Sequence, residues 1–152
     1  MTQMRAILID PFAKTITEVE HNGDWHEIYT HIKAGTFTSL TLVMPTYSEQ
    51  GEVMYLDDNG LFVKDQRYFN FGDYPQPLAG RALILGVDGQ QWSAGETVAT
   101  KMTLSEVKRQ VQWAREDLQY SHARTEHGRT KIAGKEAFVI RSIPIFKTGK
   151  EE

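Results

Sequence analysis

Short strand-like runs, most of them followed within a few residues by proline, glycine, asparagine or aspartate, recur through the first ninety residues and favour folds built from short strands. Residues 5–10 (RAILID) are rich in strand formers and end at Pro11. Residues 15–21 (TITEVEH) have the alternating pattern of a strand with one solvated face. Together the two runs predict a β-hairpin. Similar runs follow at 37–44, 52–56, 61–64 and 81–86, and the chain closes with another at 137–146.

Two segments have the spacing of amphipathic helices. In the first, Asp24 and Glu27 have the spacing of a capping box, apolar residues recur from Trp25 to Ile32, and Gly35 is the expected stop. The second is predicted to begin at Thr103, with Glu106 completing T-x-x-E. Its apolar stripe comprises Leu104, Val107, Val111, Ala114 and Leu118.

Hairpin signals outnumber βαβ signals, which favours antiparallel pairing. We therefore predict an α+β fold: a single domain over residues 1–148, with a mostly antiparallel sheet of about six strands packed by two amphipathic helices. Residues 101–146 would supply the second helix, a polar loop and the closing strand. Residues 149–152 would form a frayed tail.

Asn59-Gly60 is a strong turn signal, because both residue types tolerate positive φ. We expect Gly60 to adopt positive φ in a tight turn. The neighbouring Asp57 and Asp58 then belong to ordinary turn chemistry rather than to a catalytic carboxylate pair.

Composition excludes several kinds of protein. The chain has no cysteine, which rules out disulfides, thiolate zinc sites and cysteine nucleophiles. No apolar run approaches about 18 residues, so we expect no membrane partner. The N-terminus lacks a signal-peptide pattern, and a cytoplasmic location is expected.

Charge is unevenly distributed along the chain. Residues 1–100 hold 6 Lys/Arg and 13 Asp/Glu, whereas residues 101–152 hold 11 Lys/Arg and 7 Asp/Glu. This asymmetry has two interpretations: a basic face for a charged partner, or a basic segment that lies against the acidic part of the same chain.

Patterns typical of enzymes and metal sites are missing. No serine sits in G-x-S-x-G, and no glycine-rich stretch has a phosphate-loop pattern. Of the histidines, His26 and His31 would lie about 140° apart on a helix, and His122 and His127 have the same spacing. The fifth histidine is His21, and neither pair matches H-E-x-x-H or a zinc-finger spacing. The expectations are therefore no enzyme, no metal and no cofactor.

Part of the chain resembles a known family. The resemblance rests on the stretches 53–61 (VMYLDDNGL), 74–86 (YPQPLAGRALILG), 7–11 (ILIDP) and 15–19 (TITEV). Residues 4–90 resemble a small domain family of unknown function that is common in bacteriophages, plasmids and other mobile elements. The resemblance implies an accessory protein that acts in the host bacterial cytoplasm, and it assigns no catalytic residues.

The first functional hypothesis is a non-catalytic protein that binds a host or phage macromolecule, with protein favoured over nucleic acid. On the expected second helix, Trp113 would point about 130° away from the apolar stripe. An exposed tryptophan beside arginine is a typical interface anchor, although the same chain could also cover it. The partner-binding candidates are Arg109, Trp113 and Tyr120, which could also form a homodimer contact.

Two alternatives remain open. Basic residues interleaved with aromatic ones in 101–141 could bind nucleic acid. The candidates are Lys101, Lys108, Arg115, Arg124, Arg129 and Lys131. The other alternative is a small-molecule or nucleotide-binding pocket lined by Tyr68, Phe69, Phe71 and Tyr74.

Overall fold

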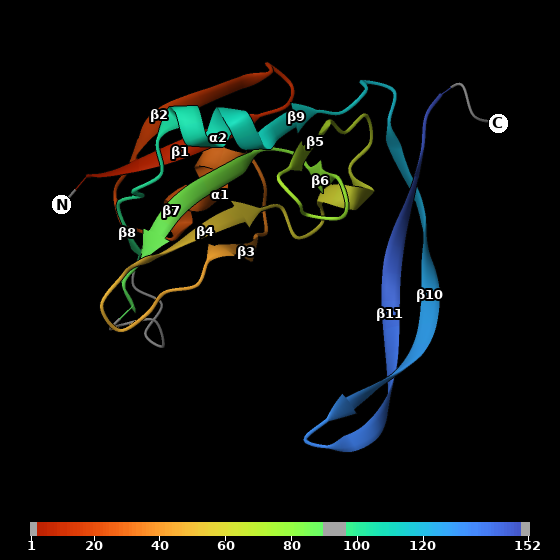
Figure 1. Ribbon diagram of the computed structural model, residues 1–152. Coiled ribbons are helices and arrows are strands. Elements are labelled where there is room, and N and C mark those ends of the chain that lie inside the picture. The colour runs from red at the N-terminus through yellow and green to blue at the C-terminus, as the bar shows by residue number, and fades with distance from the viewer. Residues whose placement is uncertain (1–2, 90–96, 150–152) are drawn as a thin grey trace. The chain divides into compact units, whose positions relative to one another are not determined.

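The computed structural model describes residues 3–89 and 97–149 (Figure 1). The chain divides into two compact units, Met1–Ala114 and Arg115–Glu152. The first unit contains both helices and two sheets, and the second contains one β-hairpin. Of the predicted 149–152 tail, residues 150–152 lie outside the described residues.

A six-stranded sheet forms the centre of the first unit, with the order β2-β1-β7-β4-β3 and with β8 paired to β7. All of its pairings are antiparallel. Its strands are β1 (Met4–Asp10), β2 (Thr15–His21), β3 (Thr38–Val43), β4 (Gly51–Leu56), β7 (Ala82–Val87) and β8 (Thr97–Val98). The hairpin of β1 and β2 is the one that the sequence predicts.

Helix α1 (His26–Ile32) covers one face of this sheet. Side chains of a strand alternate between faces, so Leu83 and Leu85 of β7 point to the same side. There they pack with Ala6 of β1 and with Ile28 and Ile32 of the helix.

The opposite face is covered by α2 (Leu104–Gln110) and a small sheet. The small sheet has the order β6-β5-β9, from β6 (Leu78–Ala79), β5 (Tyr68–Phe71) and β9 (Val111–Trp113). Val107 of α2 and Phe69 of β5 are fully buried against Ile84 of β7. Each helix therefore packs on a different face, which explains why β7 is buried along its whole length.

The two predicted capping boxes have different outcomes. At α2, the Thr103 hydroxyl accepts from the Glu106 N–H and the Glu106 carboxylate accepts from the Thr103 N–H, which confirms that box. At α1, Trp25 is the N-cap and has no side-chain capping bond, while Asp24 accepts from the His26 N–H at 3.0 Å. The first helix also ends earlier than predicted, at Lys33, which adopts the left-handed conformation.

The predicted role of Gly60 is wrong. Gly60 opens a short 3₁₀ helix, η1 (Gly60–Phe62), and is not among the positive-φ glycines of the described chain. A Cβ at Gly60 would lie 3.1 Å from both the Cβ and the carbonyl oxygen of Ala79. The glycine is needed because a neighbouring strand approaches closely, not because the turn demands positive φ. The predicted strand at 61–64 is therefore also wrong.

The second helix is shorter than the apolar spacing predicts. It ends at Gln110, and Val111 is already extended. Residues 111–113 instead pair with β5 as β9, where Phe69 lies opposite Trp113. Nothing in the local sequence stops a helix at this point; the open edge of β5 and the core beneath it favour the strand.

The second unit is a hairpin of β10 (Gln119–Ile132) and β11 (Lys135–Lys147). Its two-residue turn places Ala133 at φ 52° and Gly134 at φ 79°, the signs that a type I′ turn requires. The predicted closing strand 137–146 lies within β11, but it pairs with β10 rather than with the central sheet. The predicted polar loop is therefore a strand over most of its length.

The α+β class holds at the coarse level of mostly antiparallel strands with two helices. The expected single domain corresponds best to the first unit. The hairpin is a compact unit of its own.

Candidate functional site

The three partner-binding candidates are divided between the two units. Arg109 is exposed on α2, whereas Trp113 is half-buried in β9 and packs against the core of the first unit. Tyr120 belongs to the second unit, where its ring packs edge-on against Phe146 with 6.1 Å between centroids. The predicted outward direction of Trp113 is wrong. It assumed that Trp113 lies on the second helix, but α2 ends at Gln110, three residues before Trp113.

The predicted aromatic pocket is mostly core. Tyr68, Phe69 and Phe71 are buried in β5, and Tyr74 packs on the same cluster. Only Phe71 and Tyr74 reach a groove of about 330 Å³, which is also lined by apolar residues of β3. These aromatic residues therefore stabilise the packing of the small sheet against the six-stranded sheet.

The basic candidates are divided between the units. Lys101 and Lys108 lie in the first unit and are exposed. In the second unit, Arg115 makes two hydrogen bonds to Asp117, at 3.0 and 3.1 Å. The hairpin carries Arg124, Arg129 and Lys131.

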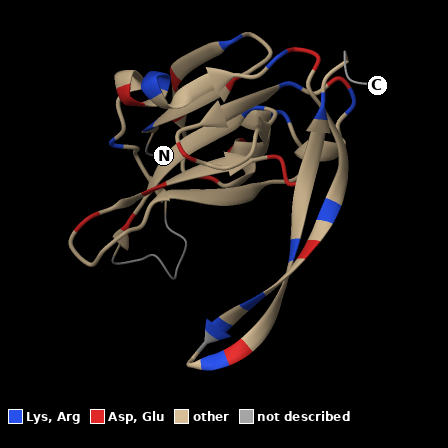
Figure 2. Ribbon diagram, turned by 45° about the vertical axis from the view of Figure 1, so that its right-hand side comes forward, with Lys and Arg blue, Asp and Glu red and all other residues tan. Residues whose placement is uncertain are grey.

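The hairpin concentrates positive charge. Residues 119–147 contain six Lys/Arg and two Asp/Glu. Figure 2 shows the lysines and arginines as blue bands along both strands, and the fewer acidic residues as red bands. Acidic residues lie beside some of them: Arg124 lies 3.4 Å from Glu126, and Arg129 lies 3.9 Å from Glu136.

One face of the hairpin is apolar as well as basic. The register pairs Arg129 with Phe138 and His127 with Ile140, so these side chains share a face. Phe138 is 76% exposed and Ile140 is 69% exposed. The Arg129 guanidinium lies over the Phe138 ring at 5.1 Å, which leaves the rest of the apolar strip uncovered within its unit.

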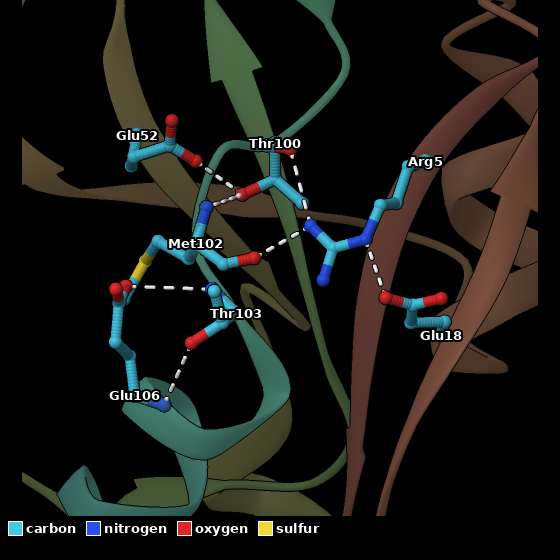
Figure 3. Close-up of polar contacts among 7 residues, drawn as sticks. All are labelled: Arg5, Glu18, Glu52, Thr100, Met102, Thr103 and Glu106. Atoms are coloured by element: carbon cyan, nitrogen blue, oxygen red, sulfur yellow. Dashed lines mark hydrogen bonds and ion pairs between the residues drawn. The ribbon is translucent and has the colours of Figure 1, made fainter.

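A buried carboxylate that the sequence analysis did not single out holds the segment before α2 (Figure 3). Glu52 of β4 accepts hydrogen bonds from the Thr100 hydroxyl, from the Gln50 amide at 2.9 Å and from the Lys101 N–H at 3.2 Å. On the other side, the Arg5 guanidinium donates to the carbonyl oxygens of Thr100 and Met102. Because these contacts join β1 and β4 to the backbone of residues 100–102, the network anchors the segment that leads into α2.

Three titratable groups meet where β2 ends and α1 begins. His21 Nδ1 lies 3.5 Å from Glu27 Oε1, and His31 Nε2 lies 3.1 Å from the same oxygen. His21 is fully buried, while Glu27 and His31 are partly exposed. Burial lowers the pKa of His21, with His31 adding to that effect and with Glu27 and Asp24 opposing it.

Histidine spacing within one segment does not reveal this group, because His21 lies on β2 and its two neighbours lie on α1. His26 and His31 do diverge, as expected: the His26 ring turns away to Asp24 and stacks on Trp25. Glu27 and His31 are four residues apart on the helix and face the same side. The i,i+4 spacing of Glu27 and His31 is the one feature of the sequence that could have indicated this cluster.

Comparisons with protein-family models, curated proteins and solved structures found no match. The mobile-element resemblance of residues 4–90 therefore remains an interpretation of the sequence. Among the described residues, the two helices have seven residues each, and neither has the length or apolar character to cross a membrane.

Proposed function

We propose that this is a non-catalytic binding protein, and that the hairpin of β10 and β11 is its binding arm. The observation that supports this most is the exposed pair Phe138 and Ile140, side by side on one face of the hairpin. Exposed apolar strips of this kind mark interaction surfaces. An isolated two-stranded hairpin is also only marginally stable in water, so a partner on this face would stabilise it.

The chemistry of the strip defines the partner. Arg129 and Lys131 lie on the face that carries Phe138 and Ile140. A matching surface offers an apolar groove bordered by carboxylates, because aromatic anchors gain energy by burial and the flanking bases gain by pairing. Such a surface is more typical of a protein than of a nucleic acid.

The proposal also includes the cellular location of this binding. The resemblance of residues 4–90 to mobile-element domains supports an accessory protein that acts on a host or phage protein in the bacterial cytoplasm.

Photo-crosslinking in bacterial cells tests the proposal directly. A photoreactive phenylalanine analogue at position 138 should form an adduct with a protein, and the same analogue at position 62 should not. Phe62 is a suitable control because it is 73% exposed and lies in the first unit. The protein identified is then purified and titrated with the wild-type chain.

In that titration, the double variant with serine in place of both Phe138 and Ile140 should bind at least about tenfold more weakly, since buried anchors dominate interface energies. Phe62→Ser should leave the affinity unchanged. Adducts only to nucleic acid, no adduct at all, or equal binding by the double variant would refute the protein-binding arm. An adduct to a second copy of the chain would identify a homodimer contact.

The excess of bases on the hairpin favours a second candidate, nucleic-acid binding. Lys131 and Arg124 are exposed and could contact phosphates, and Arg129 could do so beside the Phe138 ring. In that case affinity for DNA or RNA should fall steeply with salt, and Arg124→Gln with Lys131→Gln should reduce the salt slope by about 2. A salt-independent affinity would exclude this alternative.

A further inference from the structure

The cluster of His21, Glu27 and His31 has the composition of a metal site. The last residue of β2 supplies one imidazole, and α1 supplies a carboxylate and a second imidazole one turn apart. One ligand atom from each residue can be chosen so that all three lie within 4.8 Å of one another. Two imidazoles and one carboxylate form a donor set that suits borderline divalent ions such as Zn²⁺.

His21 is the residue that sets this cluster apart from an ordinary hydrogen-bonded pair. Its ring is completely buried, yet neither Nδ1 nor Nε2 has a hydrogen-bond partner among the described residues. Buried polar atoms are nearly always paired, so an orphaned imidazole needs an explanation. Coordination of one ring nitrogen to a cation would provide it.

The protonation state of His21 is compatible with that explanation. Burial lowers its pKa, which favours the neutral imidazole over the charged form. A neutral ring is the form that binds a metal, since the ligating nitrogen must carry a free lone pair.

The distances fit a common centre. Two ligand atoms that each lie about 2.0–2.1 Å from a tetrahedral zinc ion are separated by roughly 3.3 Å. The measured separations from Glu27 Oε1 are 3.5 Å to His21 Nδ1 and 3.1 Å to His31 Nε2. These two separations differ from the tetrahedral value by only a few tenths of an ångström, and the chosen ligand atoms of His21 and His31 lie within 4.8 Å of each other.

We propose that His21, Glu27 and His31 bind one divalent transition-metal ion of the zinc class. The three residues leave one coordination position, and the partial exposure of Glu27 and His31 gives the ion a route from solvent. The Asn22 N–H donates to Glu27 Oε1 at 3.1 Å and holds the carboxylate in place from outside the ligand set. This replaces the expectation of no metal site, which rested on spacing within single segments.

Zn²⁺ titration of the untagged full-length chain, first freed of metal with a chelator, tests the proposal. Calorimetry should show one Zn²⁺ bound per chain, and Zn²⁺ should raise the melting temperature. Co²⁺ should give the visible absorption of a tetrahedral site. His31→Gln and Glu27→Gln should each weaken binding by roughly tenfold or more, a loss at least as large as that of an outer-shell partner.

His26→Gln is the matched control, because His26 lies on the same helix but outside the cluster, and it should bind Zn²⁺ as the wild type does. If the ligand variants fold poorly, NMR of the wild-type chain decides: Zn²⁺ should shift the ring nitrogen signals of His21 and His31, and leave those of His127 unchanged. The absence of saturable binding would overturn the proposal. So would Zn²⁺ binding that both ligand variants retain, or ring shifts confined to the exposed histidines.

Discussion

The two units use antiparallel strands in opposite ways. In the first unit, β7 is buried along all six of its residues because a helix or a second sheet covers each face. In the hairpin, β10 is exposed at every position from 121 to 131. Backbone pairing is the same in both, so the difference lies in what the side chains contact. Hydrophobic burial supports the central sheet, whereas strand pairing, the turn and a few side-chain contacts support the hairpin within its unit.

The largest expected effect comes from a core truncation. Leu83→Ala removes a fully buried side chain between β7 and α1 and should cost about 3 kcal/mol of unfolding free energy. Phe138→Ala on the hairpin should change it by less than about 0.5 kcal/mol. Denaturant unfolding measures both. Equal losses would show that the hairpin face is covered in the free protein.

Trp113→Ala tests whether β9 contributes to the core of the first unit, as β7 does, or is an exposed strand like those of the hairpin. The tryptophan is half-buried against the core and lies opposite Phe69, so its loss should cost about 2 kcal/mol, less than for a fully buried ring. Arg109→Ala, at an exposed position of α2, is the control and should be nearly neutral. A neutral Trp113→Ala would restore the surface role that the sequence suggested.

Gly60→Ala probes close packing in the first unit. The added methyl group would meet Ala79 at 3.1 Å and should destabilise the protein by about 1 kcal/mol. Combining it with Ala79→Gly should recover part of the loss, because the contact atom is removed. A double variant no better than the sum of the two single variants would contradict this explanation.

Ala133→Asn probes the hairpin turn. Ala133 adopts φ 52°, which alanine disfavours and asparagine tolerates. The substitution should stabilise the hairpin by about 0.5 kcal/mol, seen as slower hydrogen exchange of β10 and β11 amides. Exchange in the first unit should not change. Faster exchange in the hairpin would argue against the I′ turn.

The smallest expected effect is a pH dependence that resides in the first unit. Burial lowers the pKa of His21, so the unfolded chain binds a proton near pH 6.5 before the folded chain does. The stability that depends on the neutral ring is complete above that pH and is lost as the pH falls below it. Glu27 and Asp24 oppose this lowering of the pKa.

Thermal melts between pH 8 and pH 5 in the presence of a chelator measure this slope. Removing the titrating group with His21→Gln should flatten it, whereas His127→Gln on the exposed hairpin should not. A slope that survives in His21→Gln would assign the pH dependence to other groups.

Local chemistry in the sequence determined several features by itself. The apolar runs of β1 and β7, the capping box of Thr103 and Glu106, and the hairpin of β1 and β2 depend on neighbours within a few residues. The same is true of the Asp57 turn, where the carboxylate accepts from the Asn59 N–H. Short-range patterns report such features because the interactions that form them are equally short.

Only the tertiary structure decided the rest. Val111–Trp113 is a strand because β5 offers an edge and a core, although the local spacing continues a helix. Gly60 is required by Ala79, nineteen residues away, and β10 is a strand because β11 pairs with it despite its polar sequence. His21 meets Glu27 and His31 only because β2 ends beside α1. In each case the deciding partner comes from another element, and hydrogen bonding or burial against that element outweighs the preference of the local residues.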